Sequence, residues 1–155
     1  MIEHNTTGNE WDVRFLRLAR EVSTWGKDPS TKCGAVAVRD RLPLVMGYNG
    51  FARGLSDTAE RLNNREEKYS RTIHAEENVI CNSSRHGISL VGATLYVYGL
   101  PICGNCAPRI IQVGIKRIVG IEMDPEKAIR WAESCAKAEA DFAEAGVIYS
   151  KIKLV

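Results

Sequence analysis

Large apolar residues recur at helical spacing near the start of the chain. They lie three or four positions apart, and charged residues such as Asp12 fall between them; the apolar positions are Trp11, Phe15, Leu18, Val22 and Trp25. This period predicts an amphipathic helix with Asp12 on its polar face. Two short apolar runs follow, 33–38 and 43–48, and the polar turn Arg39-Asp40-Arg41 between them favours an antiparallel hairpin.

Beyond residue 48 the pattern changes twice. Residues 49–70 are polar and rich in Gly, Asn and Arg, so we expect a long loop with some helix, a feature that is often functional. From residue 74 predicted helices alternate with predicted strands: helices over 74–85, 104–113 and 125–145, and strands over 94–98, 116–121 and 147–154. The last helix has an expected buried stripe of Ala128, Trp131, Cys135, Ala138 and Phe142. A hairpin followed by this alternation predicts an α/β fold with a mixed sheet.

Composition narrows the class of protein. The chain has 155 residues, of which 45% are hydrophobic, so we expect a single domain spanning 1–155 with a real core. The net charge of +2, without a basic run, gives no sign of a nucleic-acid surface. No signal peptide and no apolar run of about 18 residues is visible, which argues against a membrane partner. Five cysteines, an odd number, fit a reducing compartment, and we expect a cytoplasmic protein.

The strongest chemical signal is His74-Ala75-Glu76 followed by Cys103-Gly104-Asn105-Cys106. One imidazole and two thiolates are ligands that zinc prefers, and a catalytic zinc keeps its fourth position for water. Both segments lie where a helix is predicted to begin, and a helix N-terminus favours the thiolate form of cysteine. The sequence therefore predicts a zinc site formed by His74, Cys103 and Cys106.

Glu76 is predicted to carry protons beside the metal rather than to bind it. Zinc lowers the pKa of bound water to about 7, which makes hydroxide available to attack C4 of cytosine. Glu76 would take the water's proton, deliver it to ring N3 and later protonate the departing ammonia. The pattern is typical of zinc deaminases, in which proline usually comes directly before the first cysteine; here Ile102 separates Pro101 from Cys103.

Other interpretations of the cysteine pair stay open. A C-x-x-C pair also occurs in redox proteins, although no early βαβ context surrounds this one. A structural zinc would need a fourth protein ligand, for which the spare candidates are Cys33, Cys81, Cys135, His4 and His86. We expect these three cysteines to be ordinary buried residues and the two histidines to be exposed.

From about Trp11 to about Tyr149 the chain resembles the deoxycytidylate (dCMP) deaminases of the cytidine deaminase superfamily. The resemblance is carried by a combination of short stretches: 27–36 (KDPSTKCGAV), 47–50 (GYNG) with 53–54, 68–69 (KY) with 73–80 (IHAEENVI), and 106–107 with 110–116 (IIQVGIK). It implies a three-layer fold, with a mixed five-stranded sheet and helices on both faces. It also implies conversion of dCMP to dUMP, which supplies thymidylate synthesis.

The resemblance implies roles for further residues. It supports the same zinc ligands and proton carrier, and it places Asn49 and Ala75 at the substrate and Lys27 at its 5′-phosphate. Asn49 as a turn residue and Lys27 as a solvated surface lysine are the alternatives. Trp131 either closes over a substrate or belongs to the core.

Many members of this group are homohexamers that dCTP activates and dTTP inhibits, with Mg²⁺, at a site between subunits. The resemblance therefore implies these effectors, with Gly50 and Arg53 near them. Ala52 stands where members usually carry proline, which is a departure from the pattern.

The same residues also bear on other functions that share this zinc pattern. A nucleoside cytidine deaminase normally has cysteine where His74 stands, and a bifunctional riboflavin deaminase needs a second domain. A tRNA adenosine deaminase shares the H-A-E pattern but calls for a basic face. Two further alternatives remain open: a deaminase that acts on another cytosine nucleotide, and a non-catalytic module that binds zinc or a nucleotide. A pure binding module has no need for Glu76.

Overall fold

In the computed structural model, which describes residues 2–3 and 9–154, a mixed sheet has the strand order β1-β8-β7-β6-β2-β3. β2 is antiparallel to β3 and β6, whereas the pairs β6–β7, β7–β8 and β1–β8 are parallel. The strands are β1 (Ile2–Glu3), β2 (Gly34–Arg39), β3 (Leu42–Tyr48), β6 (Thr94–Tyr98), β7 (Arg117–Ile121) and β8 (Ile148–Ile152). The mixed α/β sheet and its five long strands are confirmed. The sixth strand, β1, was not predicted because two residues are too short to show an alternating pattern.

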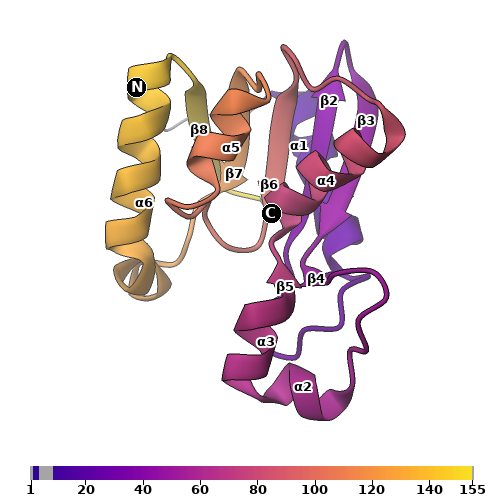
Figure 1. The fold of residues 1–155 in the computed structure, drawn as a ribbon. Helices are drawn as coiled ribbons and strands as arrows, with labels where there is room; N and C mark the ends of the chain where they lie inside the picture. Colours follow the sequence, from indigo (N-terminus) through magenta and orange to yellow (C-terminus); the bar gives the residue numbers. More distant parts are fainter. Residues whose placement is uncertain (1, 4–8, 155) are drawn as a thin grey trace.

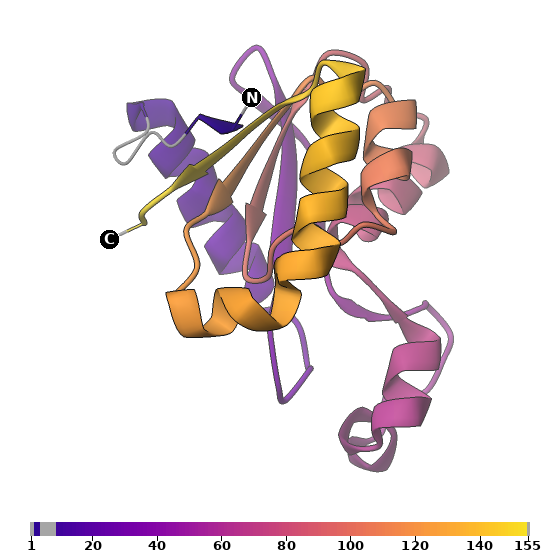
Figure 2. The same ribbon diagram turned by 90° about the vertical axis from the view of Figure 1, so that its left-hand side faces the viewer.

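Helices cover both faces of this sheet, as predicted (Figures 1 and 2). Helix α1 (Glu10–Ser23) lies on one face, and α4 (Ala75–His86), α5 (Ala107–Gln112) and α6 (Pro125–Ala145) lie on the other. Two buried apolar clusters separate the layers, one beneath α1 and one beneath the other three helices. No helix in the described ranges is long and apolar enough to cross a membrane.

The hairpin between β2 and β3 is confirmed. Its two turn residues, Asp40 and Arg41, both have positive φ, 54° and 60°. Two central residues of this kind form the tight turn whose twist matches that of the flanking strands.

The buried face of α1 differs from the predicted one at two residues, Trp25 and Asp12. Trp25 lies beyond the end of the helix and is 49% exposed. Asp12, predicted on the polar face, is only 2% exposed. Its carboxylate accepts hydrogen bonds from the Tyr96 hydroxyl at 2.8 Å and from the Arg117 guanidinium at 2.8 and 2.6 Å. A buried carboxylate is stable here because its partners come from β6 and β7, which the local pattern cannot reveal.

Asp12→Asn is expected to lower the free energy of unfolding at pH 7 by about 2 kcal/mol, because Arg117 would lose its charged partner. Burial alone would raise the pKa of Asp12, but hydrogen bonds from Arg117 and Tyr96 outweigh it and lower the pKa below its ordinary 3.8. The stabilisation is therefore full above pH 3.8 and is lost as the pH falls below that value. Urea unfolding between pH 7 and pH 3 measures both effects.

The matched control is Glu10→Gln, which removes an exposed carboxylate paired with Arg14 on the same helix. Exposed pairs contribute little, so this change should cost less than about 0.5 kcal/mol. Equal stability losses in the two variants would contradict the role given to Asp12.

The segment predicted as a long loop contains more structure than expected. It holds β4 (Gly50–Phe51), α2 (Ala59–Asn63), α3 (Arg65–Arg71) and β5 (Thr72–Ile73), and β4 pairs with β5. Thr58 and Asn64 cap the two helices through their side chains. This arm projects from the end of the sheet below α4 (Figure 1). Some helix was expected in this segment, but the bounds of α2 and α3 were not predicted because each is too short for a clear 3.6-residue period.

Helix α4 approaches the sheet very closely at Gly47 of β3. A Cβ atom at this position would lie 2.7 Å from the Ala75 carbonyl oxygen and 2.7 Å from the Val79 backbone nitrogen. Only glycine allows this approach, and it brings the first turn of α4 against the sheet.

Helix α6 begins and ends as predicted, with Asp124 as N-cap and Gly146 in the left-handed conformation after its last turn. The predicted buried stripe is correct for Ala138 and Phe142 only. Ala128, Trp131 and Cys135 are half-buried. Trp131 instead borders a cavity. The first half of α6 therefore lines this cavity rather than packing into the core.

Candidate active site

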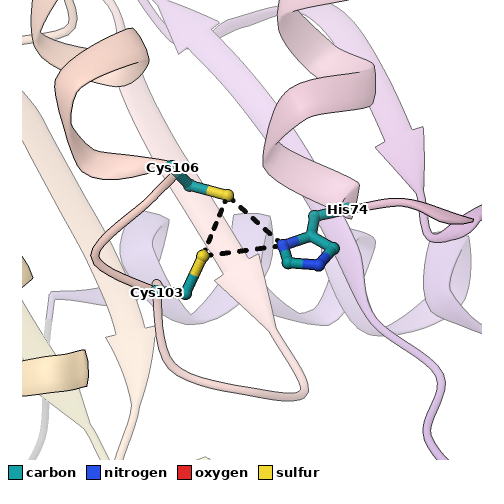
Figure 3. Close-up of side chains that lie close together, drawn as sticks. All are labelled: His74, Cys103 and Cys106. Carbon is teal, nitrogen blue, oxygen red and sulfur yellow. Dashed lines mark hydrogen bonds between the residues drawn. The ribbon is translucent and has the colours of Figure 1, made fainter. Parts of the chain in front are cut away.

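The three predicted metal ligands come together at one end of the sheet, although they lie far apart in the sequence. His74 is the N-cap residue of α4, and Cys103 and Cys106 flank the turn that leads into α5. Nδ1 of His74 lies 3.3 Å from Sγ of Cys106 and 3.6 Å from Sγ of Cys103. The two sulfurs are 3.2 Å apart, and all three donor atoms point toward one another (Figure 3).

This donor set fits zinc. A tetrahedral zinc with bonds of about 2.3 Å to sulfur and about 2.0 Å to nitrogen places its ligands roughly 3.5–3.8 Å apart. The observed separations are close to that range, and no other group of three or more ligating side chains gathers in the described part of the chain. His74, Cys103 and Cys106 would hold the ion.

The electrostatics of the cluster favour a thiolate. A hydrogen bond with Cys106 and another with His74 lower the pKa of Cys103 to about 4. The same hydrogen bond with Cys103 raises the pKa of Cys106, and burial raises it further. The hydrogen bond to Cys103 raises the pKa of His74 to about 9. A divalent metal binds thiolates and a neutral imidazole, so zinc binding would displace the protons that His74 and Cys106 hold in the metal-free site.

Glu76 lies in the first turn of α4, directly beside this cluster. It is 6% exposed, and burial raises its pKa to about 7. A carboxyl group with a pKa near 7 exchanges protons readily at neutral pH, which is what a general acid–base requires. Glu77, the next residue, has a structural role instead. Its carboxylate accepts a hydrogen bond from the His74 backbone N–H at 3.4 Å and so helps to hold the start of the helix.

A cavity of about 570 Å³ opens onto the cluster, and His74, Glu76 and Cys103 are among its lining residues. This is within the size range of small-molecule sites. Its outer walls come from α3 and the start of α6, which contribute Tyr69 and Trp131.

Asn49 and Ala75, the two residues predicted to lie at the substrate, both line this cavity. The Asn49 Oδ1 atom accepts from the Cys33 backbone N–H at 2.8 Å, and its Nδ2 donates to the Thr31 carbonyl at 3.0 Å. Asn49 therefore shapes the 31–33 loop, and one of its amide hydrogens stays available for a ligand.

The structure does not bring Lys27, Gly50 or Arg53 into this cavity. Lys27 is exposed and forms an ion pair with Asp57 at 3.0 Å. Gly50 pairs with Ile73 at the base of the arm. The Arg53 guanidinium donates to Asn82 at 2.8 Å and lines a second cavity, of about 320 Å³.

Three cations that sequence reasoning did not assign to the substrate line the first cavity: Arg65, Lys68 and Arg130. Lys68 is 8% exposed, and its Nζ lies 3.3 Å from Asp28 Oδ1 and 3.3 Å from Ser30 Oγ. For Arg65 and Lys68 the polar composition of residues 49–70 was the available signal, but only the fold shows which cations line the cavity.

The remaining spare ligands are not at the cluster. Cys33 is buried, and burial raises its pKa to about 11, so it stays a thiol. Cys135 is half-buried, whereas Cys81 is exposed, contrary to the expectation of burial. His86 is exposed as expected, and His4 lies outside the described residues.

Comparison with known proteins decides the family. The model of the cytidine and deoxycytidylate deaminase zinc-binding region matches residues 9–122, which include the three residues of the cluster and Glu76 beside them. The chain belongs to the cytidine and deoxycytidylate deaminase family. As expected for this family of enzymes, the deaminase has a zinc-type donor set with an adjacent carboxylate.

Relatives of this deaminase support the assignment. An "uncharacterized deaminase in luxG 3′region" of Aliivibrio fischeri is 39% identical over 139 residues, which cover 90% of this chain and 91% of the relative. The deoxycytidylate deaminase of Mus musculus is 37% identical over 118 residues, covering 71% of this chain. The match spans 64% of the length of the mouse enzyme.

Solved structures agree on the fold. The dCMP deaminase of cyanophage S-TIM5 superposes with a TM-score of 0.71 at 20% identity, covering 94% of this chain and 99% of that chain. The predicted cytidine-deaminase-like architecture is thus confirmed.

Proposed function

We propose that this deaminase converts dCMP to dUMP and ammonia within one catalytic domain, and so supplies thymidylate synthesis. The observation that carries the proposal is the buried Glu76 carboxyl group beside the His74, Cys103 and Cys106 donors, at the inner end of a cavity of about 570 Å³. The similarity to the mouse deoxycytidylate deaminase supports dCMP as the substrate.

The reaction follows from the properties of these residues. Zn²⁺, when bound by the three ligands, supplies a Lewis acid that makes water nucleophilic at neutral pH. Glu76 would accept one proton of the attacking water and deliver it to N3 of the cytosine ring, and would then carry the remaining hydroxyl proton from C4 to the amino group, which leaves as ammonia. Its burial keeps bulk water away from the carboxyl group, so that the proton stays at the reacting atoms.

The charges of the cavity favour a nucleotide over a nucleoside. Of its three cations, Lys68 is already paired with Asp28. Arg65 and Arg130 form no ion pair with any described residue. We propose that these two arginines bind the 5′-phosphate, because guanidinium groups suit phosphate oxygens and would otherwise lack an anionic partner. They take the role that the sequence suggested for Lys27.

The proposal is tested with purified, zinc-loaded protein and four substrates: dCMP, dCTP, deoxycytidine and a tRNA adenosine substrate. Loss of cytosine absorbance should be fast with dCMP and slow with the other cytosine compounds. A zinc-loaded protein that deaminates none of them would exclude the proposed reaction, and turnover of the tRNA substrate alone would move the assignment to a tRNA adenosine deaminase.

Arg130→Gln is expected to raise KM for dCMP about tenfold and to leave kcat/KM for deoxycytidine almost unchanged. The reason is the loss of one charge-assisted hydrogen bond, worth about 1.5–3 kcal/mol, to a phosphate that deoxycytidine lacks. Arg65→Gln should act in the same direction. Steady-state kinetics with both substrates measures the effect, and Arg85→Gln, an exposed arginine of α4, is the matched control. Equal losses with the two substrates would contradict phosphate binding by these arginines.

We extend the proposal to regulation: dCTP with Mg²⁺ activates the enzyme, dTTP inhibits it, and the active form is a homohexamer. The position of Arg53 at the second cavity, away from the catalytic cluster, supports a separate effector site near Gly50 and Arg53. Rates of dCMP turnover with and without each triphosphate and Mg²⁺, together with the mass of the particle by light scattering, test this extension. Rates that do not respond to either triphosphate would contradict it.

A further inference from the structure

The turn that carries both cysteine ligands depends on a hydrogen bond from outside itself. Within the turn, the backbone N–H groups of Cys106 and Ala107 both donate to the Cys103 carbonyl, at 3.1 and 3.3 Å. Gly104 is buried, and its N–H does not take part in this pattern. It donates instead to Oγ of Ser134, at 2.9 Å, from the middle of α6. A buried N–H without such a partner would be costly.

Helix α6 also packs directly against the same turn. A Cβ atom at Gly104 would lie 3.0 Å from Cδ of Lys137, so the stem of Lys137 covers the glycine. Trp131 comes three residues before Ser134, on the same side of the helix, and lines the cavity together with Cys103. α5 and α6 lie side by side on this face of the sheet (Figure 2). One side of α6 therefore borders both the cavity and the turn that bears the ligands.

We propose that Ser134 is a positioning residue that holds the 103–106 turn in its zinc-binding shape and thereby sets the affinity for zinc. The two sulfurs must stay within one coordination sphere, and their separation depends on the backbone of the turn. The Ser134 hydroxyl anchors the first peptide after Cys103, which is the point where the turn leaves the preceding loop. The inference rests on zinc binding at this site and not on the identity of the nucleotide.

The test measures the zinc dissociation constant by competition with a chromophoric chelator, using the full chain. Ser134→Ala is expected to raise this constant about tenfold, which is the usual lower bound for losing a group that supports a metal ligand. Ser134→Thr keeps the hydroxyl and should restore an affinity close to that of the original protein. Ser84→Ala is the matched control, because Ser84 is an exposed helical serine of α4.

The second readout separates positioning from general stability. With zinc in excess, kcat of Ser134→Ala for dCMP should return close to the original value, since the turn then closes on the metal. Equal zinc affinity of the original protein and Ser134→Ala would overturn the inference, as would a failure of Ser134→Thr to restore it. An original protein that binds no zinc would instead contradict the proposed function.

Discussion

Replacement of Glu76 by glutamine is expected to lower kcat for dCMP about a thousandfold, with zinc content unchanged. General acid–base catalysis contributes roughly 10²–10⁴-fold, and in the proposed reaction a single carboxyl group carries the proton in every transfer. Glutamine has nearly the same shape and keeps the site filled, but it cannot release and recover a proton. Steady-state kinetics with metal analysis of the same preparation measures both quantities.

Glu144→Gln serves as the control, because Glu144 is an exposed glutamate near the end of α6. It should leave both kcat and zinc content unchanged. If Glu76→Gln turns over dCMP at more than about a tenth of the original rate, Glu76 is not the proton carrier. Loss of zinc together with activity would show instead that the carboxyl group supports the metal.

The second large effect is expected for Cys106→Ala, which removes a buried zinc ligand. Apparent binding energies of about 10–16 kcal/mol for four-ligand zinc sites correspond to roughly 3 kcal/mol for each ligand. Loss of one sulfur should therefore weaken zinc binding at least a hundredfold. The purified variant should hold little zinc, deaminate dCMP at a rate close to the background, and melt at a lower temperature because a bound ion stabilises the folded state.

Cys81→Ala provides the comparison, since Cys81 is an exposed cysteine of α4 and lies apart from the cluster. It should retain one zinc per chain, full activity and the original melting temperature. Adding a strong chelator to the original protein should reproduce the Cys106→Ala properties, and added zinc should reverse them. A Cys106→Ala protein with full zinc content would remove this cysteine from the ligand set.

The catalytic cluster was predictable because its parts are local. Glu76 follows His74 by two residues at a helix start, and the two cysteines flank one turn. Each spacing places its own two side chains near each other, whereas the meeting of His74 with Cys103 and Cys106, 29 and 32 positions later, depends on the fold. The long strands were predictable for a similar reason, since alternation and continuous apolar runs are properties of single segments.

Other features depend on segments that meet only in the folded chain. Asp12 reads as a surface residue of an amphipathic helix, yet Arg117 lies 105 positions away and makes its burial possible. Trp131 matches a core stripe by its spacing, but it is only half-buried in the folded chain. Its neighbour in space is the cavity.

The sequence by itself determined the zinc-type donor set, Glu76 as the candidate proton carrier and the order of the long helices and strands, because each follows from spacings of a few residues. Only the tertiary structure decided which cations line the cavity. It directs Lys27 to Asp57 at the surface and brings Arg65 and Arg130, from separate helices, to one cavity. The physical reason is that the direction of a side chain follows from the packing of its element against distant ones, which a local pattern does not contain.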